Sequence, residues 1–286
     1  MTITITTSNV NGIRAAKRKG IEQWAAKNTP DVWCMQEVRA PQNEIDPIFD
    51  EFGFEYATAG RIADQSGLDR MNEICRIKGR AGVGLLSALP VIDKRYGLPG
   101  LAEDVDSGRW IEADVKTPQG YTVTVVCVYV NAGNTDDPEK MKQKYRFLDT
   151  MLVRMGQLRD EAAHGGKQAV LCGDFNIAHT PLDIKNAKAN EKHAGFLPEE
   201  RAYVDKWLGE LEFVDVMRSL CGGIQGPYTW WSQRGRAFDN NVGWRIDYQF
   251  ATPELAETAR GFVIDKAPTY DLRWSDHAPL SITYDV

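Results

Sequence analysis

Eight segments spread along the chain carry the hydrophobic patterns of β-strands. The first, TITITTSNV from residue 2, alternates polar and apolar side chains, which is typical of a strand with one buried face. The fifth, YTVTVVCVYV, ends in the uninterrupted apolar run 125–130, as expected of a strand buried on both faces. The other six are VWCMQEV, AGVGLLSA, RWIEADV, QAVLCGDFNI, RIDYQFAT and APLSITYDV.

Helical patterns fall between these segments. Residues 139–158 place apolar side chains at spacings of three and four, so we expect most of the basic residues there to face water. This stripe consists of Met141, Tyr145, Leu148, Leu152 and Met155. Residues 21–27 and 198–208 are further helix candidates. The mixture predicts an α/β fold of packed sheets covered by helices, although the pattern does not give the strand order.

The length of 286 residues, with no linker, charge block or internal repeat, predicts one domain spanning residues 1–286. The longest apolar run is far shorter than the roughly 20 residues that cross a bilayer. The first ten residues show no signal-peptide pattern, so we expect a soluble, intracellular protein. Five cysteines without CxxC spacing, three of them in apolar strands, predict reduced, buried thiols without disulfides or zinc.

The charge is uneven along the chain. The formal net charge of −6 argues weakly against a nucleic-acid partner. However, residues 1–20 carry four bases and no acid, and residues 139–159 carry six bases against two acids. Such a polarised surface can hold a polyanion, although for each cluster alone an ordinary solvated helix face is the favoured interpretation.

Polar side chains end six of the predicted strand segments. QAVLCGDFN, for example, ends in Asp174 and Asn176, which are two residues apart and therefore project to the same side. The other positions are Asn9 and Asn11, Glu37, Tyr129 and Asn131, Asp247, and Asp276 with His277. One buried carboxylate is commonly a cap or a satisfied core pair. Six strand ends of this kind predict one converging site.

The residue types restrict the chemistry of such a site. The sequence has no nucleophile elbow, GxGxxG motif or P-loop, and it has no HExxH spacing for zinc. Carboxylates with carboxamides suit a hard, oxygen-seeking cation such as Mg²⁺. A magnesium ion, a carboxylate that handles water and a histidine that steadies an anionic oxygen together indicate phosphodiester hydrolysis.

Six motifs resemble those of the exonuclease III and apurinic-apyrimidinic (AP) endonuclease family. SNVNGIR, MQEVRA, YVNAG, CGDFNIA, NVGWRIDY and SDHAPL occur in that family's order and with approximately its spacing, from Asn9 to His277. The segments HTPLDIKN and GFLPEER resemble the loop that follows its GDxN strand. The family is part of the endonuclease/exonuclease/phosphatase superfamily and is similar in fold to deoxyribonuclease I.

The resemblance implies a four-layer α/β sandwich, with two mixed β-sheets packed face to face and helices outside. It implies a Mg²⁺-dependent enzyme of base excision repair, in which Mn²⁺ can substitute. Such an enzyme cleaves double-stranded DNA 5′ to abasic sites and trims blocked 3′ ends to a free hydroxyl. It also implies a monomer in the cytoplasm, associated with the nucleoid if the source is bacterial.

The resemblance further implies a role for each polar residue at the strand ends. The residues expected at or near the metal are Glu37, Asn9, Asp276 and Asn11. The residues expected to act in catalysis are Asp174, Asn176, His277, Asp247 and Tyr129. Among these, Asp174 would handle the attacking water and Asp247 would orient His277. The residues expected on substrate phosphate are Asn131 and Arg39.

Three positions depart from the commonest family pattern. Arg39 stands where relatives commonly have lysine, so a planar guanidinium replaces an ammonium. Asn11 stands where some members have a carboxylate, which weakens a second metal site. His193 stands where many relatives have asparagine or serine.

The tryptophans near the C-terminus carry the substrate prediction. Trp230, Trp244 and Ile246 match family positions that line a pocket for a base-free sugar, whereas we expect Trp231 in the core. A pocket closed by indoles accepts an abasic deoxyribose and excludes a normal nucleotide by size. Extrusion of such a sugar costs least because no base has to be unpaired.

Two other functions remain open at this point. A superfamily phosphatase or phosphodiesterase could act on RNA or on phospholipid head groups, but the WRIDY segment and the upstream tryptophans favour the nuclease. A non-catalytic DNA-binding protein would tolerate the loss of Glu37, Asp174 or His277, and all three are present.

Overall fold

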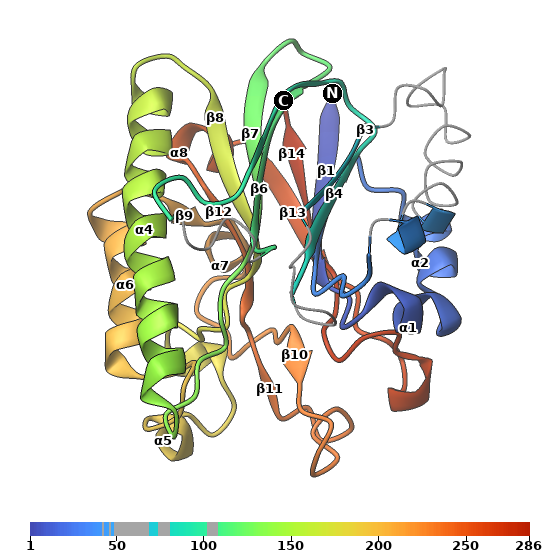
Figure 1. Ribbon diagram of the computed structural model, residues 1–286, viewed down its shortest axis with the longest axis vertical. Helices are drawn as coiled ribbons and strands as arrows, with labels where there is room; N and C mark the ends of the chain where they lie inside the picture. Colours follow the sequence, from blue (N-terminus) through green and yellow to red (C-terminus); the bar gives the residue numbers. More distant parts are fainter. Residues whose placement is uncertain (42, 46, 49–68, 74–80, 102–107) are drawn as a thin grey trace.

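The computed structural model describes residues 1–41, 43–45, 47–48, 69–73, 81–101 and 108–286. Two six-stranded sheets pack face to face, and helices cover the outer face of each. From left to right, Figure 1 shows α4 and α6, the second sheet, the first sheet, and then α1 and α2. The predicted four-layer α/β sandwich is therefore confirmed.

The first sheet has the strand order β13-β14-β1-β2-β4-β3. Its strands β1 and β2 run parallel and every other neighbouring pair is antiparallel, so the sheet is mixed. The strands are β1 (Thr2–Asn9), β2 (Val32–Gln36), β3 (Asp69–Glu73), β4 (Val83–Ser87), β13 (Ala259–Ile264) and β14 (Leu280–Asp285).

The second sheet has the strand order β5-β6-β7-β8-β12-β9. It is also mixed, because β7 and β8 run parallel while the other neighbours are antiparallel. The strands are β5 (Val91–Tyr96), β6 (Trp110–Lys116), β7 (Thr122–Tyr129), β8 (Gln168–Asp174), β9 (Val214–Asp215) and β12 (Asp247–Ala251). A separate short ribbon pairs β10 (Trp230–Trp231) with β11 (Gly243–Trp244).

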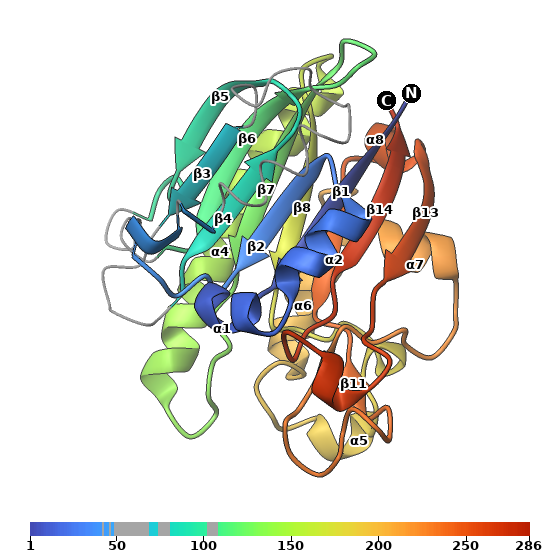
Figure 2. The same ribbon diagram turned by 90° about the vertical axis from the view of Figure 1, so that its right-hand side faces the viewer.

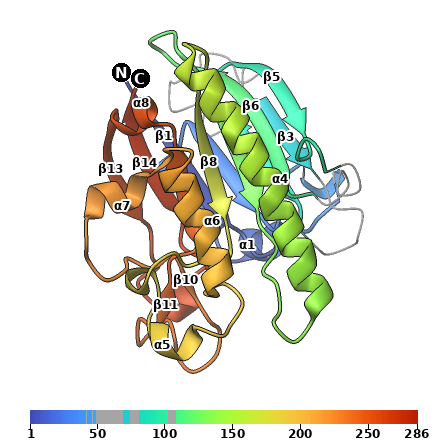
Figure 3. The same ribbon diagram turned by 90° about the vertical axis from the view of Figure 1, so that its left-hand side faces the viewer.

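The helices form the outer layers. Figure 2 shows α1 (Ile13–Arg18) and α2 (Ile21–Asn28) in front of the first sheet, and Figure 3 shows α4 (Pro138–Ala163) and α6 (Pro198–Gly209) in front of the second. The shorter helices are η3 (Pro181–Asp183), α5 (Ala187–Asn190), α7 (Val216–Cys221), α8 (Pro253–Ala256) and η4 (Tyr270–Leu272). In the described ranges, each helix is too short or too polar to cross a membrane.

Apolar side chains fill the spaces between the layers. The space between the sheets holds Ile5, Val125 and three cysteines, Cys34, Cys127 and Cys172, which are buried and free as predicted. Cys221 is also free, and Cys75 lies outside the described residues. A second cluster packs α4 and α6 on the second sheet, and a third packs α1 and α2 on the first.

The prediction for α4 was partly wrong. The helix exists and most of its bases are not buried, as expected, but Lys144 is fully buried and paired with Glu200. Tyr145 and Leu152 of the predicted stripe are only partly buried, whereas Phe147, Met151 and Leu158 are buried on the second sheet. Because the helix packs on a broad sheet, it buries a wider face than the predicted stripe of residues spaced three and four apart.

Gly173 sits where the second sheet leaves no room for a side chain. A Cβ atom there would lie 1.9 Å from the carbonyl oxygen of Val128 on the parallel neighbour β7. The glycine therefore allows β7 and β8 to remain paired up to their last residues. Those last residues, Tyr129 and Asp174, are both predicted site residues.

We expect Gly173→Ala to lower the free energy of unfolding by about 3 kcal/mol or more, because the backbone must shift to remove the clash. Urea unfolding followed by circular dichroism measures the change. Gly209→Ala at the end of α6 is the matched control, since a Cβ atom there meets nothing within 4 Å. Equal stability of the two variants would contradict this account of Gly173.

Candidate active site

Strand register places three predicted site residues in a row on the second sheet. Tyr129 on β7 is paired with Asp174 on β8, and Asp174 is paired with Asp247 on β12. All three are buried, with at most 9% of each residue exposed. The row forms because the parallel strands β7 and β8 end at the same level, where the antiparallel β12 begins.

The amide of Asn9 joins this row to the first sheet. Asn9 ends β1, and its Nδ2 donates to Glu37 Oε1 and to Asp174 Oδ2, each at 2.9 Å. Glu37 directly follows β2, the parallel neighbour of β1. One side chain therefore bridges carboxylates that come from the ends of both sheets.

Glu37 has three polar neighbours. Its Oε1 accepts hydrogen bonds from Asn9 and from the Tyr129 hydroxyl, the latter at 2.6 Å, while its Oε2 contacts the Arg39 guanidinium. The backbone at Glu37 and Arg39 has φ values of 55° and 52°, in the left-handed region. Such conformations cost about 1–3 kcal/mol each and persist only where the surroundings fix them.

Asp276 comes from the segment before β14 and is linked to Glu37 through side chains. Asn11 donates to Asp276 Oδ1 at 2.7 Å and accepts from Arg39 at 2.9 Å. The Trp230 indole donates to Asp276 Oδ2 at 3.2 Å. Burial alone would raise the pKa of Asp276, but His277 and these two donors lower it below its ordinary value.

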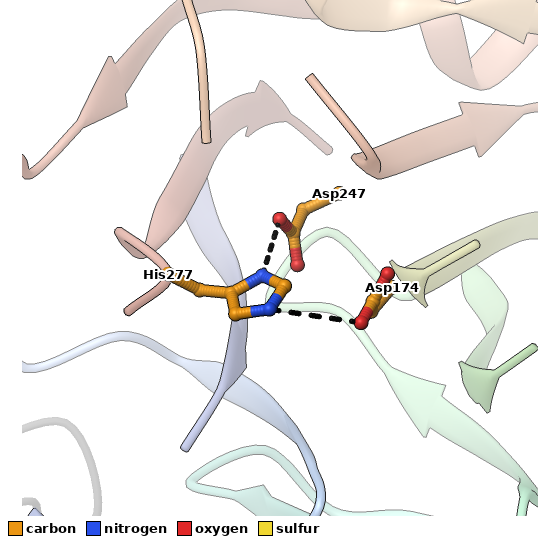
Figure 4. Close-up of side chains that lie close together, drawn as sticks. All are labelled: Asp174, Asp247 and His277. Atoms are coloured by element: carbon orange, nitrogen blue, oxygen red, sulfur yellow. Dashed lines mark hydrogen bonds and ion pairs between the residues drawn. The ribbon is translucent and has the colours of Figure 1, made fainter. Parts of the chain in front are cut away.

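His277 stands between two aspartates, as Figure 4 shows. Its Nδ1 lies 2.9 Å from Asp247 Oδ2, and its Nε2 lies 3.8 Å from Asp174 Oδ2. The backbone N–H of Asp247 donates to Thr229 Oγ1, and that of His277 donates to Ser275 Oγ. The imidazole is therefore held in one orientation, with Nε2 directed toward Asp174.

Electrostatics set the protonation of this group. Burial lowers the pKa of His277, but the Asp247 carboxylate, helped by Asp174 and Asp276, overcomes that effect and raises the pKa to about 10. Burial raises the pKa of Asp174 to about 7, with Asp247 and Glu37 adding to the rise while His277 and Asn9 oppose it. At neutral pH the site therefore combines a protonated imidazole with a carboxylate that is ready to exchange a proton.

A cavity of about 550 Å³ opens over these groups. Its lining is Asn11, Glu37, Arg39, Tyr129, Ala132, Gly133, Asp174, Asn176, Asn190, His193, Ala194, Gly195, Trp230, Trp244, Ile246, Asp276 and His277. Asn9 and Asp247 are predicted site residues that lie behind this lining. Asn131 is not part of the lining, although Ala132 beside it is.

The three predicted pocket residues lie together in this cavity. Trp230 and Trp244 face each other across the β10-β11 ribbon, with ring centroids 6.0 Å apart and ring planes at 85°. Ile246 packs with both tryptophans. Trp231 instead is buried against Phe238, as expected of a core residue.

The residues that the sequence did not predict are Ala132, Gly133, Asn190, Ala194 and Gly195. They are small or amide side chains in the loops that follow β7 and β8, and no charge or aromatic marks them. The feature of the sequence that could have predicted Asn190, Ala194 and Gly195 was the polar segment NAKANEKHAGF, residues 186–196. Only His193 was noted there, as a departure from the family pattern.

The donor set fits a hard divalent cation. Glu37 and Asp276 supply carboxylate oxygens on one side of the cavity, and Asn9 and Asn11 supply neighbouring amides. A guanidinium already contacts Glu37, so positive charge is favoured beside this carboxylate. Asp174, Asp247 and His277 also offer ligand atoms within 4.8 Å of one another, but Asp247 and His277 satisfy each other by a hydrogen bond. Glu37 with Asp276 is therefore the better candidate for holding a hard divalent cation.

Comparisons with known proteins agree with the resemblance seen in the motifs. The model of the endonuclease/exonuclease/phosphatase family matches residues 6–277. An exodeoxyribonuclease from Bacillus subtilis is 29% identical over 279 residues, 97% of this chain and 98% of that protein. An AP endonuclease from Archaeoglobus fulgidus gives a TM-score of 0.81 at 30% identity, covering 99% and 100% of the two chains. A Neisseria 3′ phosphatase bound to a product DNA hairpin gives 0.80 at 27%, with the same coverage.

The charge on His277 can be tested directly. Without metal, the His277 ring should stay protonated through neutral pH and lose its proton near pH 10, well above the ordinary value of 6.5. Asp247→Asn removes the negative charge that most strongly raises the pKa of His277, while burial still lowers it. The titration midpoint of His277 should therefore fall by about two pH units or more. NMR titration of the ring protons measures both midpoints. The exposed His193 is the internal reference, and an unchanged His277 midpoint in the variant would refute this pairing.

Proposed function

The chain belongs to the endonuclease/exonuclease/phosphatase family, and on that basis we propose that it is a Mg²⁺-dependent DNA repair nuclease. It cleaves double-stranded DNA 5′ to abasic sites and removes blocking groups from 3′ ends, leaving a 3′ hydroxyl. Residues 1–286 act in this proposal as one domain. The homologous exodeoxyribonuclease, AP endonuclease and 3′ phosphatase support a DNA substrate.

One observation carries the proposal. A single cavity combines a carboxylate pair suited to magnesium, an Asp174–His277–Asp247 group, and an apolar wall of Trp230, Trp244 and Ile246. The polar groups suit the reaction of a phosphodiester. The apolar wall suits a sugar that lacks its base.

Glu37 and Asp276 would hold the magnesium ion, with Asn9 keeping the Glu37 carboxylate in place. When bound, the ion would neutralise charge on the phosphate and favour attack by water. The Tyr129 hydroxyl, which donates its one O–H to Glu37 at 2.6 Å, faces the same cavity and could turn that O–H to substrate phosphate instead. Burial and the neighbouring Glu37 and Asp174 raise the pKa of Tyr129, so the phenol stays a donor.

Asp174 is placed to handle the attacking water. The Asn176 backbone N–H fixes its Oδ1 at 2.9 Å, and the Asn9 amide fixes its Oδ2. A pKa of about 7 lets the carboxylate accept a proton near neutral pH. Beside it, the protonated His277 can donate to a non-bridging phosphate oxygen and stabilise the negative charge that grows there.

The wall of Trp230 and Trp244 supports selectivity for abasic sites. A base-free deoxyribose turned out of the duplex would pack against the indoles and Ile246, whereas an attached base would collide with them. Because Trp230 also donates to Asp276, the pocket and the metal site share one side chain. A sugar seated in the pocket would therefore place its 5′ phosphate over the carboxylates.

Three labelled duplexes test the proposal: one with an abasic site, one with a 3′ phosphate and one with a plain recessed end. We expect incision and 3′ phosphate release that require Mg²⁺ and stop with EDTA. Glu37→Gln, which removes the anionic ligand, should lower both rates by at least about a hundredfold. If RNA or phospholipid head groups are hydrolysed while all three duplexes stay intact, the proposed substrate is wrong.

Trp244→Ala tests the sugar pocket. Trp244 is only partly buried, so we expect a modest loss of stability and a change in selectivity. Incision at abasic sites should fall about tenfold or more, while removal of normal 3′ nucleotides holds or rises as the opening widens.

The ratio of these two rates on matched duplexes is the measurement, taken together with a thermal melt. Trp231→Ala is the matched control, because that fully packed indole should instead cost about 3–5 kcal/mol of stability and leave the ratio unchanged. A constant ratio in Trp244→Ala would contradict a role for Trp244 in selecting the abasic sugar.

A further inference from the structure

Lys144 is a buried charge in a helix whose other bases mostly face water. No part of its side chain is exposed, and the same is true of its partner Glu200 on α6. An ammonium group has three N–H donors, and three acceptors surround this one. They are Glu200 Oε1 at 2.5 Å, the Asn176 carbonyl at 2.9 Å and the Ala132 carbonyl at 3.1 Å. Each of the three ammonium N–H groups of Lys144 therefore has a hydrogen-bond acceptor.

The other end of Glu200 holds a third segment. Glu200 Oε2 accepts hydrogen bonds from the backbone N–H of Gly195 at 2.6 Å and of Leu197 at 3.0 Å. The Glu200 carboxylate thereby caps the start of α6 and fixes the turn before it. The Lys144–Glu200 pair thus ties together the loop after β7, the loop after β8 and the turn before α6.

All three segments form one wall of the cavity. Ala132, Gly133, Asn176 and Gly195 belong to its lining, but Lys144 and Glu200 do not. The contacts along this wall are close: a Cβ on Gly133 would meet the Lys144 side chain at 3.2 Å, and a Cβ on Gly195 would meet the Trp244 ring at 3.0 Å. A small movement of these loops would therefore displace both Asn176 and the indole wall.

We propose that Lys144 and Glu200 are positioning residues that hold this wall of the active-site cavity at the depth the reaction requires. The inference rests on the proposed nuclease function for its kinetic consequences and on the contacts above for its structural ones. A purely stabilising role explains the pair less well. Buried ion pairs are often no more stabilising than apolar side chains of similar volume, because desolvation offsets their attraction.

The test compares two double variants in the full-length protein. Lys144→Met/Glu200→Gln removes both charges of the pair, and the glutamine keeps an acceptor for the N–H groups of Gly195 and Leu197. Arg154→Met/Glu112→Gln is the matched control. It removes a largely buried ion pair between Arg154 on the same helix and Glu112 on β6, and neither residue lines the cavity. The single variant Lys144→Met is left out of the kinetic comparison because an unpaired buried carboxylate can prevent folding.

We expect the Lys144→Met/Glu200→Gln variant to cleave abasic DNA at a single-turnover rate about tenfold to a hundredfold below wild type. The affinity for DNA should change by less than about threefold, because contacts elsewhere on the surface persist. The control variant should keep the wild-type rate even where its melting temperature falls as far. Equal rates in the two double variants, at a temperature well below both melts, would overturn the positioning role.

Amide hydrogen exchange provides a readout that does not depend on activity. Residues 132–133, 176 and 193–197 should lose protection in the Lys144→Met/Glu200→Gln variant and keep it in the control. If wild-type protein cleaves none of the DNA duplexes while this pattern of protection appears, the proposed function fails and the structural inference stands. Unchanged protection along the wall would overturn the inference, whatever the substrate.

Discussion

The hydrogen bonds of the Asn9 amide are the interaction on which the site depends. They join the Glu37 carboxylate, which follows the first sheet, to the Asp174 carboxylate, which ends the second. Two carboxylates drawn together in a dry place repel each other, and a neutral donor between them offsets part of that cost. The face-to-face packing of the two sheets fixes the separation of the Glu37 and Asp174 carboxylates. The site therefore depends on the interface between the two sheets.

The excess of negative charge in the active site explains the protonation of its groups and why a cation is favoured there. Glu37, Asp174, Asp247 and Asp276 lie in or just behind one cavity. Among the described residues, the cations in contact with them are Arg39 and the protonated His277. This balance holds a proton on the imidazole and leaves room for a divalent ion, while burial raises the pKa of Asp174. The same field that makes these clustered carboxylates costly favours a divalent cation beside them.

The sequence by itself determined the layers and most of the chemistry. Alternating and continuous apolar runs predicted the central strands, because the local spacing of apolar residues indicates which strand faces are buried. Polar residues at strand ends predicted that Asp174 and Glu37 belong to a functional site, because carboxylates are costly to bury unless they have a function. The periodic pattern did not reveal β5, whose side chains are mostly exposed, or β13, whose side chains are exposed or only partly buried.

Tertiary structure decided what depends on distant segments meeting. The register that aligns Tyr129, Asp174 and Asp247 arises from strand pairing, and periodicity gives no strand order. The left-handed backbone at Glu37 is held by partners such as the N–H of Gly12, which no local propensity predicts. Lys144 appeared to be a solvated base because a buried ammonium is stable only where several acceptors surround it. Those acceptors come from loops far apart in sequence, so only the folded chain brings them together.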